Sequence, residues 1–230
     1  MDFNGFQKLT LLDYPGKVAC TLFLAGCNFR CPFCHNAFLV TDIDNSIVFP
    51  EEEILAYLKK RKGILEGVCI TGGEPLLRHG LEDFIKKVKD LGLCVKLDTN
   101  GTDPEKLKGL IEKGLIDYVA MDIKTCPDKY PLVAGVPNLD VSPILKSVEL
   151  LKTNIVPYEF RTTIVKELHE IQDIEKIGEW IKGTPKYFLQ NFVDSGNLIE
   201  GNLHEHDKET LEKMVKIART FVPNAEIRGI

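Results

Sequence analysis

The sequence predicts an α/β domain in which a parallel β-sheet is wrapped by helices. Short apolar runs rich in β-branched residues alternate with amphipathic segments along most of the chain, an alternation typical of parallel sheets covered by helices. The 230 residues contain no low-complexity segment and no linker-like stretch. We therefore expect residues 1–230 to form one domain.

The first half of the chain supplies the clearest elements. The run 18–25 ("VACTLFLA") predicts a buried strand that leads into a cysteine-rich loop. Segment 49–63 has Pro50 near its start, acidic residues first and basic residues last, an order that complements a helix dipole. We expect a strand running into a glycine turn at 67–73, a strand and loop at 93–101, and a strand at 116–124. Further helices are expected at 81–92 and at 103–114, where Asp103 is the N-cap and Pro104 the first helical residue.

The second half continues the same alternation. Strands are expected at 155–165 and 186–192, and helices at 142–153, at about 168–182 and from about Asp207 to 221. The domain would have a core of about 17–192, followed by residues 193–230 with a helix and a possible extra strand. Periodicity does not distinguish an open sheet from a partial (β/α)6 barrel of the TIM type.

Composition argues against several classes of protein. The net charge of -5 leaves no basic footprint for nucleic acid. The sequence shows neither a signal-peptide pattern nor an apolar run long enough to cross a membrane, so we expect a cytoplasmic protein without a membrane partner. Seven cysteines are too few, and odd in number, for a disulfide framework. The scattered ones are expected in or near the core: Cys20, Cys69, Cys94 and Cys126.

Unusual polar motifs follow the predicted strands. Because ligands gather at the carboxyl ends of parallel strands, we expect these motifs to share one rim. They comprise the cysteine loop, "TGGEP" (71–75), "DTNG" (98–101), "DIK" (122–124), Arg161 and Gln190. Gly72 and Gly73 permit close backbone approach to a ligand, Glu74 offers a carboxylate to an amine, and Lys124 could neutralise a carboxylate.

The loop "GCNFRCPFCHN" (26–36) holds Cys27, Cys31 and Cys34 in the spacing C-x3-C-x2-C. Three thiolates on one loop favour zinc or an iron–sulfur cluster. A zinc site would need His35 as its fourth ligand, which is awkward because adjacent residues seldom turn both side chains toward one metal. A four-iron cluster held by three cysteines leaves one iron open, and this indicates a reactive site.

These residues carry a family resemblance. "CNFRCPFC" (27–34) matches the C-x3-C-x-aromatic-C signature of radical S-adenosylmethionine (radical SAM) enzymes, and "GGEP" (72–75) is similar to their glycine-rich motif on the next strand. "DYPGKVACTLFLAGCNFRCPFCHN" (13–36), "KLDTNG" (96–101) and "AMDIK" (120–124) resemble the glycyl-radical-enzyme activases. The resemblance is to the subgroup that activates anaerobic ribonucleoside-triphosphate reductase, with pyruvate formate-lyase activase more distant.

The resemblance implies a partial (β/α)6 barrel with one [4Fe-4S] cluster on Cys27, Cys31 and Cys34, whose open iron binds SAM. Reduction of the cluster would cleave SAM to a 5'-deoxyadenosyl radical, which would generate a glycyl radical on a partner enzyme. The residues it implies for cofactor binding are Phe33, His35, Gly72, Gly73, Glu74, Asp98, Asn100, Asp122, Lys124 and Arg161. A monovalent cation near Asp98 and Asp122 is also implied.

The chain departs from the activase pattern in two places. Pyruvate formate-lyase activase carries a histidine near the position of Gln190 and Asn191, so the contact made there is open. Residues 37–68 contain no cysteine, whereas many activases insert a ferredoxin-like stretch in this region. We therefore expect one cluster and an external electron donor, flavodoxin or ferredoxin.

Three functions remain to be weighed. The leading hypothesis is an activase of a glycyl radical enzyme, with anaerobic ribonucleotide reductase as the partner. The alternative within the same superfamily acts on a small molecule, as 7-carboxy-7-deazaguanine synthase does. A zinc-binding interaction protein would leave the glycine and aspartate motifs unexplained.

Overall fold

The computed structural model describes residues 1–44, 46, 48–194 and 196–229, and its main element is one large β-sheet. The strands of this sheet are β2 (Gly5–Thr10), β3 (Ala19–Leu24), β5 (Gly67–Gly72), β6 (Cys94–Thr99), β7 (Tyr118–Asp122), β8 (Tyr158–Ile164), β9 (Tyr187–Asn191) and β10 (Ala225–Arg228). They lie in the order β10-β9-β8-β7-β6-β5-β3-β2, and all neighbours are parallel except β2 and β3. The predicted α/β class with a parallel sheet is confirmed.

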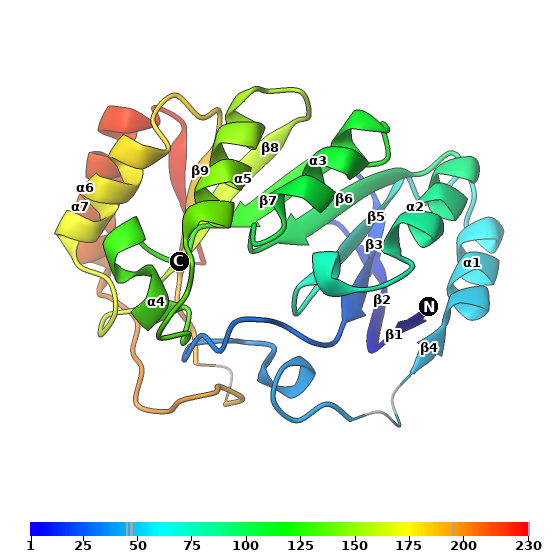
Figure 1. The fold of residues 1–230 in the computed structure, drawn as a ribbon, viewed down its shortest axis with the longest axis horizontal. Helices are drawn as coiled ribbons and strands as arrows, with labels where there is room; N and C mark the ends of the chain where they lie inside the picture. The colour runs from blue at the N-terminus through cyan, green and yellow to red at the C-terminus, as the bar shows by residue number, and fades with distance from the viewer. Residues whose placement is uncertain (45, 47, 195, 230) are drawn as a thin grey trace.

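The sheet curves without closing on itself. Figure 1 shows it bent so that the helices follow its outer, convex face, while loops run across the opposite side. The edge strands β2 and β10 have no pairing with each other in the described part of the chain. The fold is therefore the partial barrel that the family resemblance implies, a choice that periodicity left open. A separate two-stranded sheet, which the sequence pattern did not reveal, joins β1 (Asp2–Phe3) to β4 (Phe49–Pro50).

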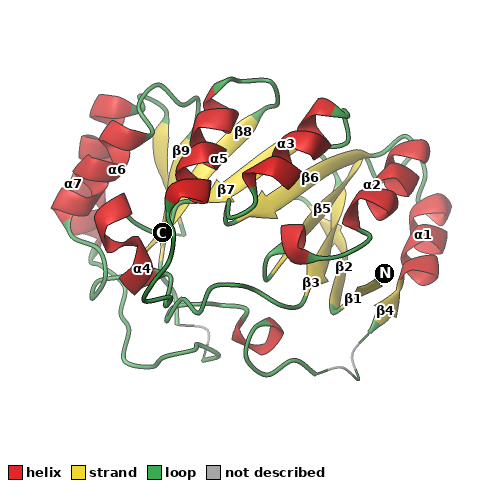
Figure 2. Ribbon diagram, viewed as in Figure 1, coloured by secondary structure: helices red, strands yellow, loops and turns green. Residues whose placement is uncertain are grey.

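Six of the helices in the described part of the chain lie close to their predicted positions, whereas the short α4 was not predicted from the sequence (Figure 2). They are α1 (Glu51–Lys60), α2 (Leu81–Asp90), α3 (Pro104–Glu112), α4 (Tyr130–Val133), α5 (Ser142–Lys152), α6 (Ile171–Trp180) and α7 (Lys208–Phe221), with short 3-10 turns at Ala37–Leu39, Pro75–Leu77 and Pro127–Lys129. Asp103 and Asp207 cap α3 and α7 by accepting the N–H of Lys106 and Thr210. None of the described helices is both long and apolar enough to cross a membrane.

One helix begins later than the sequence pattern predicts. A helix was expected from about Leu168, but α6 begins at Ile171 because the chain first makes a tight turn. The N–H groups of Leu168 and His169 both donate to the Val165 carbonyl. Glu170 then forms a reciprocal capping box with Asp173, which defines the helix start.

Strand alternation separates the two faces of the sheet. On β6, Val95 and Leu97 belong to the apolar core beneath the helices, whereas Lys96 and Asp98 point the other way, into the barrel. The same alternation on β7 and β8 brings Asp122 and Arg161 to the inner face. Polar side chains thus line the inside of the barrel near the carboxyl ends of the strands.

A small apolar cluster lies at the amino ends of β3 and β7. Tyr14, from the loop between β2 and β3, packs with Ala19 and Tyr118 in a small separate core cluster. Gly67 leaves room for this ring, since a Cβ there would meet it at 3.0 Å.

Candidate functional site

A cavity of about 420 Å³ lies inside the barrel and is bordered by the cysteine loop. Its lining contains every residue that the sequence singled out for cluster or cofactor binding except Glu74. Gln190 also lines it, whereas Asn191 does not. The side-chain oxygen of Asn191 is instead buried without a hydrogen-bond partner among the described residues.

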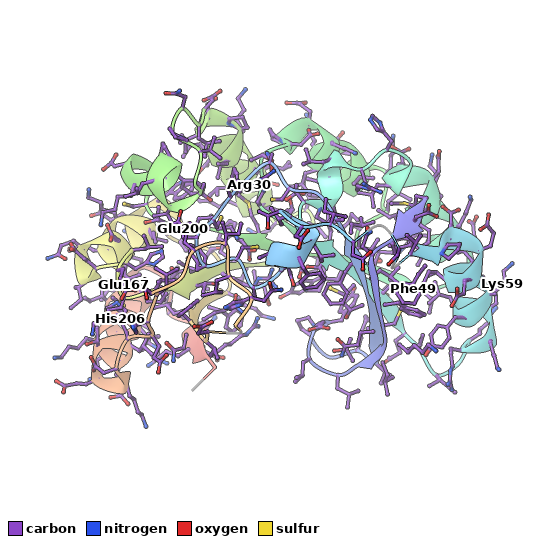
Figure 3. The ribbon with its side chains drawn as sticks, turned by 90° about the horizontal axis from the view of Figure 1, so that it is seen from below. Arg30, Phe49, Lys59, Glu167, Glu200 and His206 are labelled. Atoms are coloured by element: carbon purple, nitrogen blue, oxygen red, sulfur yellow. The ribbon has the colours of Figure 1, made fainter. Side chains whose placement is uncertain are left out.

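The cysteine loop is held in place by backbone hydrogen bonds. The Gly26 N–H donates to Leu39 (2.7 Å), and the Arg30 N–H donates to Ala134 (2.8 Å). The N–H of Glu200, in the segment after β9, donates to Pro32 (3.0 Å). Figure 3, which looks onto the loop side of the sheet, labels Arg30 in the cysteine loop and Glu200 in the segment that contacts it. These backbone hydrogen bonds thus fix the position of the loop that carries the three thiols.

All three sulfurs of the loop face the same cavity. Cys31 is 6% exposed, while Cys27 and Cys34 are half-buried. Burial raises the pKa of the Cys31 thiol to about 12, with a smaller opposing effect from Lys124. No three His, Cys, Asp or Glu side chains enclose a single metal ion in the described residues. The donor set of three thiols around one cavity suits a cluster with an open position.

The glycine turn after β5 packs directly against the start of the cysteine loop. The Gly73 N–H donates to Leu24 and the Glu74 N–H to Gly26, both at 2.8 Å. A Cβ on Gly72 would lie 2.3 Å from the Leu24 oxygen, and one on Gly73 would lie 2.1 Å from the Gly26 oxygen. Gly72 therefore permits close packing against the end of β3, and Gly73 permits close packing against the first residue of the cysteine loop.

The Glu74 carboxylate is turned away from the cavity and is 0% exposed. Oε1 accepts the Leu76 N–H and the Thr99 hydroxyl, both at 2.9 Å, and Oε2 accepts the Asn100 N–H at 2.6 Å. Burial raises the pKa of Glu74 to about 7 against the opposing effect of these hydrogen bonds. In this structure the carboxylate holds the "DTNG" turn rather than facing a ligand.

A network of ion pairs joins the ends of β6, β7 and β8. Arg161 donates to Asp122 through Nε (2.9 Å) and to Asp98 through a guanidinium N–H (3.2 Å). Lys96 pairs with Asp98, and Lys124 pairs with Asp122 at 3.1 Å. Burial alone would raise the pKa of Asp122, but Arg161 and Lys124 outweigh it and lower that pKa to about 2. Both carboxylates are therefore ionised at neutral pH.

Two aromatic contacts shape the rim. Phe33 is buried and packs edge-on against His169, with ring centroids 6.2 Å apart. His35 stacks on Phe192 at 5.7 Å. His169 Nδ1 accepts the Val165 N–H (3.1 Å) and Nε2 donates to the Lys124 carbonyl (2.7 Å). This buried imidazole joins the loops that follow β7 and β8.

Several lining residues had escaped the sequence analysis. Thr21 and Thr163 lie on the inner face of their strands, and Cys69, which the sequence predicts in or near the core, is fully buried there and also lines the cavity. Lys96 does not line the cavity but pairs with Asp98, and period-2 alternation predicts it on the same strand face. Asp13 carries no such signal, since it reaches the cavity from a loop and accepts the Thr21 hydroxyl at 2.5 Å.

Comparison with known proteins decides the family. The family described as "Radical SAM superfamily" matches residues 21–181. The chain belongs to the radical SAM superfamily. Membership implies a [4Fe-4S] cluster and SAM, and the cavity with its three thiols fits both. The cofactors that membership of the radical SAM superfamily implies are therefore those that the cysteine loop predicts.

Two curated relatives match this radical SAM enzyme almost end to end. A protein of Methanocaldococcus jannaschii, provisionally named a glycyl-radical enzyme activating enzyme, is 34% identical over 99% of this chain and 95% of its own length. The pyruvate formate-lyase-activating enzyme of Clostridium pasteurianum is 26% identical over 93% of this chain and 96% of its own.

A solved structure shares the fold. A domain of the pyruvate-formate lyase-activating enzyme from Bacteroides vulgatus superposes with a TM-score of 0.59 and 21% identity. The match covers 71% of this chain and 99% of that domain. At this identity the likeness concerns the fold alone.

Proposed function

We propose that this radical SAM enzyme is an activase that generates a glycyl radical on a partner enzyme, and that the partner is an anaerobic ribonucleoside-triphosphate reductase. The observation that carries the proposal is the nearly end-to-end match to relatives named as activating enzymes. The likeness of the motifs to the subgroup for ribonucleotide reductase supports the choice of partner. The proposal treats residues 1–230 as one cytoplasmic radical SAM domain.

The proposal assigns Cys27, Cys31 and Cys34 as cluster ligands. When bound, the cluster and SAM supply the radical chemistry through one-electron reductive cleavage of SAM. The protein positions these groups and shields them from water. Phe33 and His35 would contact the cofactor with their aromatic rings at the rim of the cavity. Gly72 and Gly73 allow the turn after β5 to pack closely against Leu24 and Gly26, beside the cavity.

The ion-pair network suits the zwitterionic end of SAM. Lys96, Arg161 and Lys124 oppose Asp98 and Asp122, so the cluster of side chains carries one surplus positive charge. A ligand carboxylate near Lys124 would balance it, while the exposed edge of Asp122 could accept from an amine. Glu74 would contribute through the "DTNG" turn that it holds.

The proposal includes a monovalent cation that binds near Asp98 and Asp122 in addition to SAM. Cationic side chains already pair with both carboxylates, so a metal cation would have to displace one of them. SAM cleavage measured with potassium, with sodium and with a bulky organic cation tests this point. The electron is assigned to an external flavodoxin or ferredoxin.

Anaerobic reconstitution tests the function. We expect about four iron and four sulfide per chain and reductant-dependent cleavage of SAM. With the partner present, a glycine-centred EPR doublet should appear, and substitution of the partner's radical glycine by alanine should abolish it. A doublet on another glycyl radical enzyme alone would overturn the choice of partner. If deoxyadenosine formation instead requires a small metabolite and no partner is labelled, the activase assignment fails.

A further inference from the structure

Asn100 links the buried Glu74 carboxylate to a sulfur of the cysteine loop. Its backbone N–H donates to Glu74 at 2.6 Å, and its side chain lies against Asn28 and Cys27. The residue is only 6% exposed. The sequence placed Asn100 among residues that bind a cofactor, but its contacts in the structure are to the loop that carries the thiols.

The hydrogen bonds around the carboxamide determine which way it faces. Its oxygen accepts the Thr102 hydroxyl (2.7 Å) and the Thr102 N–H (3.1 Å). Its nitrogen donates to the Asn28 oxygen at 2.9 Å, and Asn28 in turn donates to the Thr102 hydroxyl at 2.8 Å. These hydrogen bonds among Asn100, Asn28 and Thr102 are all satisfied in only one orientation of the Asn100 carboxamide. In that orientation its NH2 group faces Cys27.

Two hydrogen-bond donors approach the sulfur of Cys27. Among the described residues, the sulfurs of Cys31 and Cys34 accept no such hydrogen bond. The Phe29 N–H lies 3.3 Å from the Cys27 sulfur, and the Asn100 amide nitrogen lies 3.9 Å from it. The first donor belongs to the backbone of the loop. The second depends on a side chain and on the Glu74 anchor behind it.

We propose that Asn100 is a positioning residue that acts through Cys27 to raise the reduction potential of the cluster. The inference rests on the proposed ligation of the cluster by Cys27. One electron from an external reductant adds one negative charge to the cluster and its thiolates. A donor aimed at a ligating sulfur stabilises that added charge and makes reduction easier. Glu74 supports this role by holding the backbone of Asn100.

Redox titration of the reconstituted enzyme, without SAM and followed by the EPR signal of the reduced cluster, tests the inference. At a fixed solution potential, Asn100→Leu should lower the ratio of reduced to oxidised cluster by about threefold to tenfold. Asn100→Asp keeps the shape and the acceptor for Thr102 but turns an oxygen toward Cys27, so it should lower the ratio at least as far. Asn36→Leu is the matched control, because the Asn36 amide donates to the Gly72 carbonyl and not to a sulfur.

The outcomes separate this inference from the proposed function. A wild-type protein that takes up no cluster would contradict the ligation by Cys27. An intact cluster whose reduction is the same in wild type, Asn100→Leu and Asn100→Asp would overturn the role of Asn100. An equal fall in Asn36→Leu would also overturn it, since the effect would then be general to the cavity. If Asn100→Leu loses iron, the ratio of reduced to oxidised cluster in the isosteric Asn100→Asp variant decides whether Asn100 affects the reduction of the cluster.

Discussion

The Arg161 side chain, from the middle of β8, binds the carboxylate of Asp122 at the end of β7, with 2.9 Å between Nε and Oδ1. Asp122 and Arg161 are direct neighbours in the register of β7 and β8. The pairing therefore follows from strand alignment and places a cation in the lining of the cavity.

Removing Arg161 should destabilise the protein, because two partly buried carboxylates, those of Asp98 and Asp122, would lose a shared cation. We expect Arg161→Met to lower the free energy of unfolding by about 3 kcal/mol, measured by urea denaturation at neutral pH. Lys86→Met is the control, since the Lys86–Glu82 pair lies on the surface of α2 and should contribute little. Equal losses in the two variants would contradict the structural role of Arg161.

Alanine at Gly73 should be costly, because the new Cβ would lie 2.1 Å from a backbone oxygen of the cysteine loop. Backbone would have to move, so we expect Gly73→Ala to lose about 1–3 kcal/mol of stability and to bind SAM weakly. A Cβ added to Gly109, inside α3, would meet no atom within 4 Å beyond its own stretch of helix. Gly109→Ala should instead gain about 0.5–1 kcal/mol. Thermal unfolding and SAM-binding titrations should separate the two substitutions.

Stability should depend on pH through Glu74. Burial raises its pKa from 4.5 to about 7, so between these values the folded protein binds more protons than the unfolded chain. Stability then falls as pH rises through this window, by about 3 kcal/mol in total. Glu74→Gln should remove this component. Urea denaturation of both proteins from pH 4.5 to 7.5 measures it, and parallel profiles would contradict the buried carboxylate.

His169 should produce a dependence of opposite sign. Burial lowers the pKa of this imidazole below its ordinary value of 6.5, despite its hydrogen bonds to Lys124 and Val165. Below that value the unfolded chain binds the proton first, so stability decreases as pH falls, by at most about 1.4 kcal/mol per pH unit. His169→Gln cannot take up the proton and should not show this decrease. If both proteins lose stability equally between pH 6.5 and 5.5, another group is responsible.

Much of the fold and of the site could be predicted from local patterns. The helices at α1, α3 and α7 carry charge order or capping residues in their own sequences, and each was found close to its observed bounds. Strand-end motifs were expected on one rim because parallel strands share a direction. Cys27, Asp98, Asp122 and Arg161 do line one cavity.

Other features carry little local signal. The edge strand β2 has three exposed residues in a row and breaks the period-2 pattern at a bulge. The N-terminal pair β1 and β4 is only two residues long in each strand. Elements this short are stabilised by partners far along the chain, which a sequence window does not contain.

By itself, the sequence determined the parallel α/β class, the three-thiol loop and the rim where the polar motifs meet, because periodicity, residue spacing and the alternation of strands with helices can be followed along the chain. Only the tertiary structure decided where individual side chains turn. Glu74 faces the Asn100 backbone rather than the cavity, and Lys96 and Asp13 enter the barrel beside predicted residues. A side chain's direction depends on which donors and charges the fold places within reach, and those partners come from strands and loops distant in the sequence.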